Sequence, residues 1–127
     1  MITGLADTTV VLHIFRKYAP AREWLDNQAM LPGFTSISWL EVMYGAPGKV
    51  AQAQSKAILS RFELVHLTQA DQEWAMQQIE QLRLSHGVSI NDCLIASVAH
   101  RLQVPLYTHN LKHMRVLLGD TLPQKPY

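Results

Sequence analysis

Apolar residues along the chain alternate between short continuous runs and longer stretches with helical spacing, most clearly in residues 89–114. The first half of this stretch has an apolar stripe with the spacing of one helix face, formed by Leu94, Ile95, Val98, Ala99 and Leu102. An apolar run at residues 104–107 follows, and Pro105, which cannot donate to a strand ladder, fits its beginning. The pattern predicts a helix, a tight turn and a strand that ends at residues 108–110.

The rest of the chain repeats this alternation. Apolar runs bounded by turn residues predict three further strands, at residues 2–6, 34–37 and 64–67. Helical spacing between polar start signals and Gly or Pro stop signals predicts helices at residues 10–15, 20–27, 38–46, 49–61, 70–85 and 111–118. Pro123 and Pro126 predict a poorly ordered or docked tail. Strands that alternate with helices in this way are typical of an α/β domain with a parallel sheet.

Length and composition limit the class of protein. A chain of 127 residues is long enough for one domain with its own core, and we expect that domain to span residues 1–127. The 48% of hydrophobic and 17% of charged residues indicate a compact protein slightly short of surface charge, with room for a partner interface. The net charge of +1 means that a nucleic-acid site would require local clustering of basic residues.

The compartment is predicted from cysteine content and hydropathy. The single Cys93 excludes an intrachain disulfide. No signal peptide and no apolar run of membrane length is apparent in the sequence. We therefore expect the protein in the cytoplasm, without a membrane partner.

Three carboxylates follow a strand or stand near the start of a predicted helix: Asp7, Glu41 and Asp92. Asp7 ends the first strand and Glu41 follows the second, and in a parallel sheet these ends share one edge. Three carboxylates at one edge repel each other unless they are protonated or bridged by a cation, and such oxygen ligands suit Mg²⁺ or Mn²⁺. The pattern therefore predicts a metal cluster.

Each acid also has a purely structural interpretation. Asp7 can cap the helix that follows it. Residues 38–41 and 89–92 both have the Ser-x-x-acid spacing of a capping box, in which the acid binds back to the helix start. Residues 68–71 have an equivalent Thr-x-x-Asp spacing, and we interpret Asp71 as a cap alone. The motif by itself is therefore weak evidence for a site.

Three segments together resemble one known family: LADTTVV at residues 5–11, SISWLEVMYGA at 36–46, and SINDCLIASVAHRLQVPLYTHNLKHM at 89–114. The chain resembles PIN-domain proteins over its whole length, and specifically the VapC-type toxin ribonucleases. The motif positions that characterise the family are filled here by Asp7, Glu41, Asp92, Thr108 and Asn110.

The resemblance implies a three-layer α/β/α fold with a short, mainly parallel sheet of four or five strands flanked by helices. It implies an endoribonuclease that hydrolyses RNA with Mg²⁺ or Mn²⁺ as the cofactor. Asp7 and Asp92 would be direct metal ligands, and Glu41 would bind the metal through waters or position the attacking water. A small VapB-type antitoxin and a second copy of the chain are the implied protein partners.

Residues near the end of the fourth strand are expected to support this chemistry. Thr108 can orient a neighbour through its hydroxyl, and Asn110 can supply a neutral oxygen or donate to a phosphate. Lys112 and Arg115 lie just beyond and are candidate RNA phosphate contacts. Their alternative role is to complement the dipole of the short helix that contains them.

The sequence departs from the family pattern at two points. Thr9 stands where the family often has Asn, and neither Asn110 nor His113 is an acid, so a fourth acid is missing. His109 and His113 are four residues apart, but no third soft ligand accompanies them, and we interpret both as surface or RNA-facing residues. The missing acid leaves open a catalytically silent PIN fold that binds RNA or a protein.

A phosphorylated signalling receiver has a similar length and an early Asp. It needs an acceptor Asp at the end of a middle strand and a Lys at a later strand end. The third and fourth predicted strands lead into residues 67–69 and 108–110, which contain neither. The sequence therefore disfavours this class.

Overall fold

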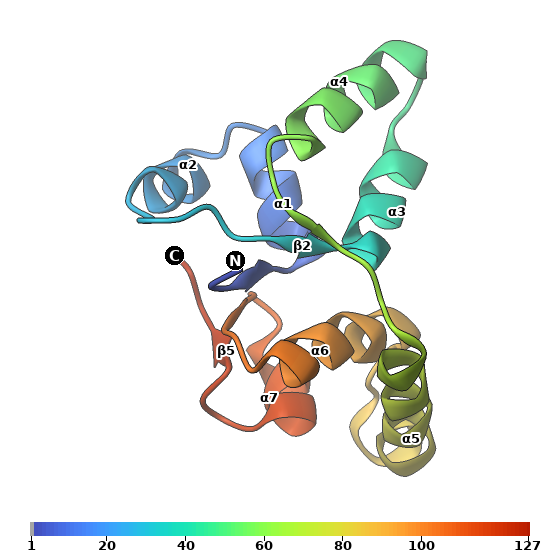
Figure 1. Ribbon diagram of the computed structural model, residues 1–127. Helices are drawn as coiled ribbons and strands as arrows, with labels where there is room; N and C mark the ends of the chain where they lie inside the picture. Colours follow the sequence, from blue (N-terminus) through green and yellow to red (C-terminus); the bar gives the residue numbers. More distant parts are fainter. Residues whose placement is uncertain (1) are drawn as a thin grey trace.

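The computed structural model describes residues 2–127 as short strands that alternate with helices (Figure 1). The elements in chain order are β1 (Leu5–Ala6), α1 (Thr8–Phe15), α2 (Ala19–Asp26), β2 (Phe34–Thr35), α3 (Ser36–Gly45), α4 (Lys49–Leu59), β3 (Leu64–Val65), α5 (Gln69–His86), α6 (Ile90–Leu102), β4 (Leu106–Tyr107), α7 (Leu111–Leu118) and β5 (Pro123–Gln124). None of the helices within residues 2–127 is long and apolar enough to cross a membrane.

The strands form a parallel sheet in the order β3-β2-β1-β4-β5. β1 pairs with β4, β4 with β5, and β2 with β3, all in parallel. A parallel bridge between Leu5 and Gly33 joins the two groups of strands. It includes hydrogen bonds of 2.9 Å from Gly33 N to Gly4 O and from Ala6 N to Gly33 O. β1 therefore lies at the centre of the sheet.

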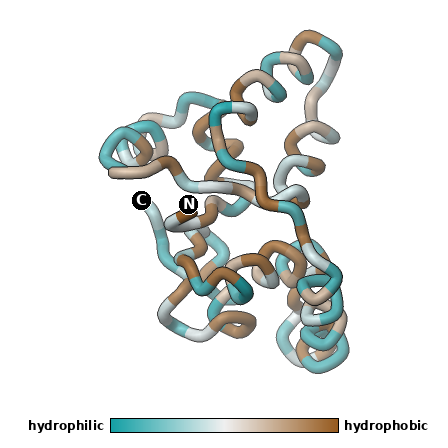
Figure 2. Tube along the Cα trace, in the orientation of Figure 1, coloured by the Kyte–Doolittle hydropathy of each residue, from teal (hydrophilic) through white to brown (hydrophobic). Residues whose placement is uncertain are grey.

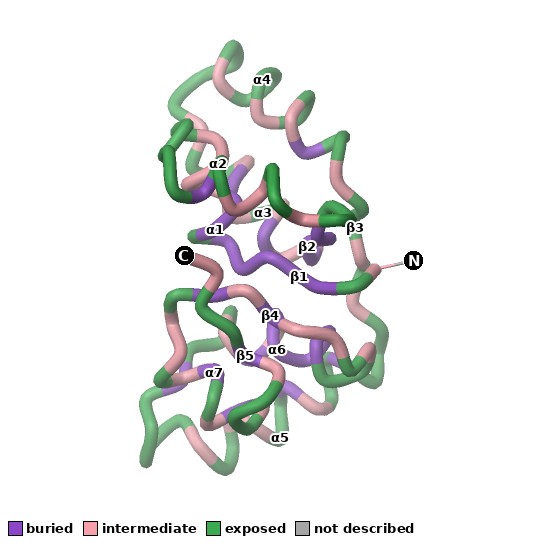
Figure 3. The backbone as a smooth tube through the Cα atoms, turned by 90° about the vertical axis from the view of Figure 1, so that its left-hand side faces the viewer, coloured by how far each residue is buried: buried purple, intermediate pink, exposed green. Residues whose placement is uncertain are grey.

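Helices cover both faces of this sheet, with α1–α4 on one side and α5–α7 on the other (Figure 1). Figure 3 shows that the buried residues gather on the strands and the helix segments that face them, whereas α4 and α5 are largely exposed. Figure 2 shows hydrophobic and hydrophilic residues alternating along the helices, as expected for helices with one buried face. The arrangement confirms the predicted three-layer α/β/α fold with its short parallel sheet.

The two sides have separate buried clusters. One packs α5, α6 and α7 against β1 and β4, and its largest members include Leu5, Ile95, Val98, Leu106 and Met114. The other packs α1, α3 and α4 against β2 and includes Val10, Val42, Leu59 and Phe34. Because both clusters lie directly against the strands, the ends of those strands are held in fixed positions.

Helix α6 follows the sequence prediction closely. The Ser89 side chain caps its start, and residues 95–99 are all buried. Gln103 ends the helix in the left-handed conformation at φ 53°, with its N–H bonded to Ala99 O at 2.8 Å. This is the tight turn predicted between the helix and β4.

The predicted start of the third helix at Ser38 is wrong. β2 ends at Thr35, and the Thr35 hydroxyl caps α3 by accepting from Ser38 N at 3.3 Å. Ser38 is therefore fully buried inside the first turn, and Glu41 lies beyond that turn. Ser38 and Glu41 do not form a capping box, because the strand ends two residues earlier than its apolar run suggests.

The tail is docked as a strand. Pro123–Gln124 forms β5 on the edge of the sheet, where Leu106 N donates to Leu122 O at 2.8 Å and Thr108 N donates to Gln124 O at 2.9 Å. Pro123 fits because a residue on an edge strand can leave its backbone nitrogen without a ladder partner. The alternative of a poorly ordered tail is therefore wrong.

Candidate active site

The ends of β1 and β4 bring Asp7 and Thr108 together. Ala6 lies opposite Tyr107 in the sheet, so the next residue of each strand leaves the same edge. Thr108 Oγ1 donates to Asp7 Oδ2 at 2.7 Å, and Asp7 Oδ1 accepts from Thr8 N at 2.8 Å. The bond to Thr8 makes Asp7 the N-cap of α1. Contacts with Thr108 after β4 and with Thr8 of α1 thus fix its side chain, and only 8% of the residue is exposed.

Thr8 connects this position to α3. Its hydroxyl donates to Glu41 Oε1 at 2.9 Å and lies 2.8 Å from the hydroxyl of Ser38. Thr8 and Ser38 are buried, so the Glu41 carboxylate is held by a polar network beneath it. Our candidate site residues did not include Thr8 and Ser38. The available signals were the Asp-Thr pair directly after a strand and a Ser one helical turn before Glu41.

Asp92 approaches from the start of α6. Ser89 Oγ accepts from Asp92 N at 3.0 Å, and Asp92 Oδ2 accepts from Ser89 N at 3.4 Å, so the capping box is present. The same Asp92 oxygen lies 3.4 Å from Nδ1 of His113. Asp92 therefore has the structural role considered for it and also faces a residue of α7.

Asn110 and His113 lie next to Thr108 and Asp92. Asn110 N donates to Thr108 Oγ1 at 3.0 Å, which places Thr108 between Asn110 and Asp7. Asn110 Nδ2 and His113 Nδ1 are 3.4 Å apart. The three-residue spacing from Asn110 to His113, across the start of α7, was the signal that this histidine could reach the site.

Burial and like charges raise the pKa of Asp7 above its ordinary value. Desolvation is the largest cause, and the hydrogen bonds from Thr108 and Thr8 act in the opposite direction. The charges of Asp92 and Glu41 raise the pKa further. Asp92 and Glu41 are therefore close enough to Asp7 for their charges to disfavour its ionised form.

The chemistry of these residues fits a hard divalent cation, which would relieve the repulsion around Asp7. However, the side chains as they stand bind protein donors, and within residues 2–127 no three His, Cys, Asp or Glu are grouped to hold one ion. Mg²⁺ commonly binds one or two carboxylates and keeps several waters. A cation bound by Asp7 and Asp92 alone would thus be consistent with this geometry.

Lys112 and Arg115 are exposed on α7, and neither forms an ion pair with another described residue. Arg115 is in the last turn, where a cation complements the helix dipole. Lys112 is near the start of the helix, where that explanation fails. The helix dipole therefore does not account for Lys112, whose side chain is free in solvent.

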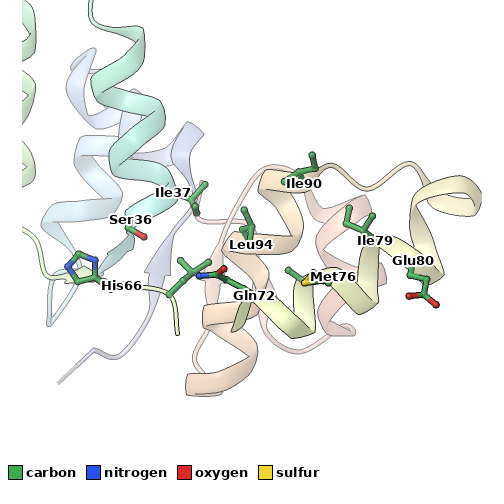
Figure 4. Close-up of a pocket in the computed structure, with 11 residues that line it drawn as sticks. Ser36, Ile37, His66, Gln72, Met76, Ile79, Glu80, Ile90 and Leu94 are labelled. Atoms are coloured by element: carbon green, nitrogen blue, oxygen red, sulfur yellow. The ribbon is translucent and has the colours of Figure 1, made fainter. Parts of the chain in front are cut away.

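A second concave surface lies apart from the acids. It is an apolar groove of about 780 Å³ between α5, α6 and the start of α3 (Figure 4). Its apolar lining includes Ile37, Met76, Ile79, Ile90 and Leu94. Met76 is 69% and Ile90 is 68% exposed. None of the candidate acids lines this groove, so its composition suits contact with a protein.

The family model of the PIN domain matches residues 5–116, a range that contains all the candidate acids. The chain belongs to the PIN domain family. This confirms the family expected from the sequence. Comparison with curated proteins gives no match.

Solved structures with the same fold come from several bacterial complexes. They include a toxin-antitoxin complex from Klebsiella pneumoniae, with 24% identity, 98% of each chain covered and a TM-score of 0.79. DNA-bound VapBC from Salmonella typhimurium has 23% identity, full coverage of both chains and a TM-score of 0.80. FitAcB from Neisseria gonorrhoeae has 18% identity, 97% coverage of each chain and a TM-score of 0.77. At these identities, the matches establish the fold.

Proposed function

We propose that this chain is a metal-dependent endoribonuclease and the toxin of a VapBC-type toxin–antitoxin pair, with one PIN-like domain over residues 1–127 that acts in the cytoplasm. The observation that carries the proposal is the position of Asp7 in a PIN-family chain: it is buried at the end of β1, and the nearby charges of Asp92 and Glu41 help to raise its pKa. Such a group of acids is costly unless it binds a cation. The structural likeness to toxin–antitoxin complexes supports the biological role.

Asp7 and Asp92 would hold Mg²⁺ or Mn²⁺. When bound, the cation supplies a water of lowered pKa, orients the phosphate and offsets charge in the transition state. Thr108 fixes the Asp7 carboxylate through its 2.7 Å hydrogen bond. Glu41 accepts from Thr8 in the absence of substrate and can instead accept from the attacking water. No side chain of the protein has to act as a nucleophile.

Residues after β4 would bind the RNA. The Asn110 side-chain amide can donate to a phosphate oxygen, and the hydrogen bond from its backbone N–H to Thr108 holds the residue beside Asp7. Lys112 and Arg115 are exposed on the helix that follows and can contact neighbouring phosphates. These phosphate contacts do not depend on base sequence, so they account for binding of a nucleic acid but not for the choice of cleavage site.

A small VapB-type antitoxin and a second copy of the chain are the proposed protein partners. Two exposed apolar surfaces support this part of the proposal. One is the groove that contains Met76 and Ile90. The other is on α3 and α4, where Leu40 is 56%, Tyr44 is 93% and Val50 is 74% exposed. Extended apolar surface of this kind commonly marks protein contact.

Expression of the chain alone, followed by sequencing of the RNA ends that accumulate, tests the proposed function. We expect new ends with the parent chain, none with Asp7→Asn, and parent-like ends with Asp120→Asn. Asp120 is an exposed acid in the loop before β5 and serves as the matched control. Identical RNA ends with and without the expressed parent would favour the catalytically silent alternative.

A further inference from the structure

Side-chain rings from four segments gather beyond the acids, at the far end of α1. We define the ring cluster as His13, Tyr18, His109 and Tyr127. The ring centroid of His13 lies 5.0 Å from that of Tyr18 and 5.6 Å from that of His109. The ring centroids of His109 and Tyr127 are 4.7 Å apart. Nδ1 of His13 and the Tyr127 hydroxyl are 2.6 Å apart. The four rings therefore pack edge to face or tilted against one another as one cluster.

The cluster is connected to the acidic site through two elements. His109 directly follows Thr108, whose hydroxyl binds Asp7. His13 lies on α1, the helix that Asp7 caps. A helix of this length spans roughly 12 Å, a distance that a strand of a few nucleotides can cover. A polymer bound at the acids could thus extend across the rings.

Two of the four rings are available to a ligand and the other two support them. Tyr18 is 49% exposed, and His109 is also exposed. His13 and Tyr127 are half-buried between and beneath them. Trp24 of α2 packs near Tyr127, with ring centroids 6.1 Å apart, and in Figure 1 the C-terminal segment runs from β5 toward α2. The supporting rings are therefore fixed by the fold.

Positive charge surrounds the exposed rings. His13 and Tyr18 line a hollow of about 480 Å³ together with Arg16, Lys17 and Ala19. Lys125 follows β5, whose Gln124 carbonyl binds the backbone of Thr108, the residue before His109.

Acids do not neutralise this rim. Arg16, Lys17 and Lys125 make no ion pair with any other residue in the described range. Glu23 and Asp26 line a neighbouring hollow with Lys17 and Arg22, and they do not line the hollow beside Tyr18. The charge beside the exposed rings is thus suited to phosphate groups.

Exposed flat rings with unpaired cations beside them are the combination that binds single-stranded nucleic acid, by base stacking and phosphate contact. We propose that the ring cluster is a base-stacking subsite that holds an unpaired nucleotide of the RNA on Tyr18 and His109, with Arg16, Lys17 and Lys125 on its phosphates. The proposal rests on the proposed function, because it extends the RNA bound at the acids onto the rings. It selects single-stranded RNA over duplex RNA, whose bases are not free to stack.

Binding of a fluorescein-labelled single-stranded RNA 12-mer tests this proposal, with fluorescence anisotropy in EDTA to prevent cleavage. Stacking is worth about 1–3 kcal/mol per base, so Tyr18→Ala should weaken binding roughly 5- to 150-fold. Tyr18→Phe keeps the ring and should bind like the parent. Arg16→Ala should also weaken binding, whereas Lys56→Ala, on the outer part of α4, should not. Thermal melts verify that each variant is folded.

Several outcomes would overturn the subsite. Parent-like RNA binding by both Tyr18→Ala and Arg16→Ala would do so, as would equal affinity of the parent for single-stranded and duplex RNA. The third such outcome would be binding of an acidic glutamate peptide that depends on Arg16 and Tyr18 while RNA binding does not depend on them. The surface would then be a protein-binding site. If these variants bind normally but the parent still cleaves RNA, only the subsite fails. If the parent neither binds nor cleaves RNA, the proposed function fails as well.

Discussion

Divalent cation should stabilise the parent chain, and Asp7→Asn should remove most of that effect. Asp7 is buried and repelled by Asp92 and Glu41, so a cation that binds these carboxylates binds the folded state only. At a concentration 100 times its dissociation constant, the ion adds about 2.7 kcal/mol. For a chain of 127 residues this corresponds to a melting shift on the order of 10 °C.

Asp7→Asn removes one of the two proposed direct ligands. If the affinity falls about a hundredfold, the same ion concentration adds only about 0.4 kcal/mol, or roughly 1–2 °C. The assay is thermal unfolding with EDTA, Mg²⁺ or Mn²⁺. Asp92→Asn should reduce the shift similarly. In EDTA it should also lose up to about 1 kcal/mol, because Asp92 belongs to the capping box of α6.

The metal-free variants separate the two interpretations of Asp7. If repulsion dominates, Asp7→Asn should be at least as stable as the parent in EDTA. If Asp7 acts only as a structural acceptor, the variant should lose stability, because an amide has one oxygen where Asp7 accepts from both Thr8 and Thr108, and the cation should have no effect. Asp120→Asn is the control and should keep the full shift. An unchanged melting temperature of the parent in millimolar Mg²⁺ and Mn²⁺ would refute the convergence of the acids on a metal.

Three further predictions follow from individual contacts. The pKa of Asp7 in the folded state is raised above 3.8, so the native state holds this proton more tightly than the unfolded state, and metal-free stability should fall as pH rises through the folded pKa. Denaturant unfolding of the parent and of Asp7→Asn should give different slopes of unfolding free energy against pH, and equal slopes would contradict the prediction. Thr8→Val should cost about 1–3 kcal/mol in chemical unfolding, since Glu41 loses its donor; a neutral effect would mean that water replaces Thr8. Asp71→Asn should lower the free energy of unfolding by about 1–3 kcal/mol, more than loss of a helix cap alone, because buried Asp71 forms an ion pair with Arg101 at 3.0 Å. RNA cleavage per folded molecule should be unchanged.

Local patterns predicted the elements whose signals lie within a few residues. Helix α6 is an example, because its apolar stripe, the Ser89 cap and the turn at Gln103 are all contained in one segment. The rule that parallel strands end at one edge also predicted that polar residues after the strands gather there, and Asp7 and Thr108 do follow paired ends of β1 and β4. These inferences needed only periodicity and the geometry of parallel strands.

Features that depend on distant partners could not be predicted in the same way. The start of α3 at Ser36 is set by where β2 stops pairing with β3, and the segment offers several Ser and Thr residues as caps. β5 is a strand only because β4 offers it an edge. The pairing of Asp71 with Arg101 spans 30 residues and leaves no trace in the spacing of either helix.

The contact between Asp92 and His113 shows the same limit within the candidate site. Its 3.4 Å distance depends on how α7 packs against α6. Sequence spacing could connect His113 to Asn110, three residues before it, but not to the acid on another helix. The sequence therefore predicted the local partner of Asp92, Ser89 of the capping box, whereas the contacts between different elements required the tertiary structure.

Cleavage of a defined RNA by the purified chain is the most direct test of the central claim. We expect the parent to cut the RNA in Mg²⁺ or Mn²⁺ and not in EDTA, Asp120→Asn to cut like the parent, and folded Asp7→Asn and Asp92→Asn to lose cleavage. Cleavage by Asp7→Asn at the parent rate, or by the parent in EDTA, would contradict a metal-dependent nuclease centred on these acids.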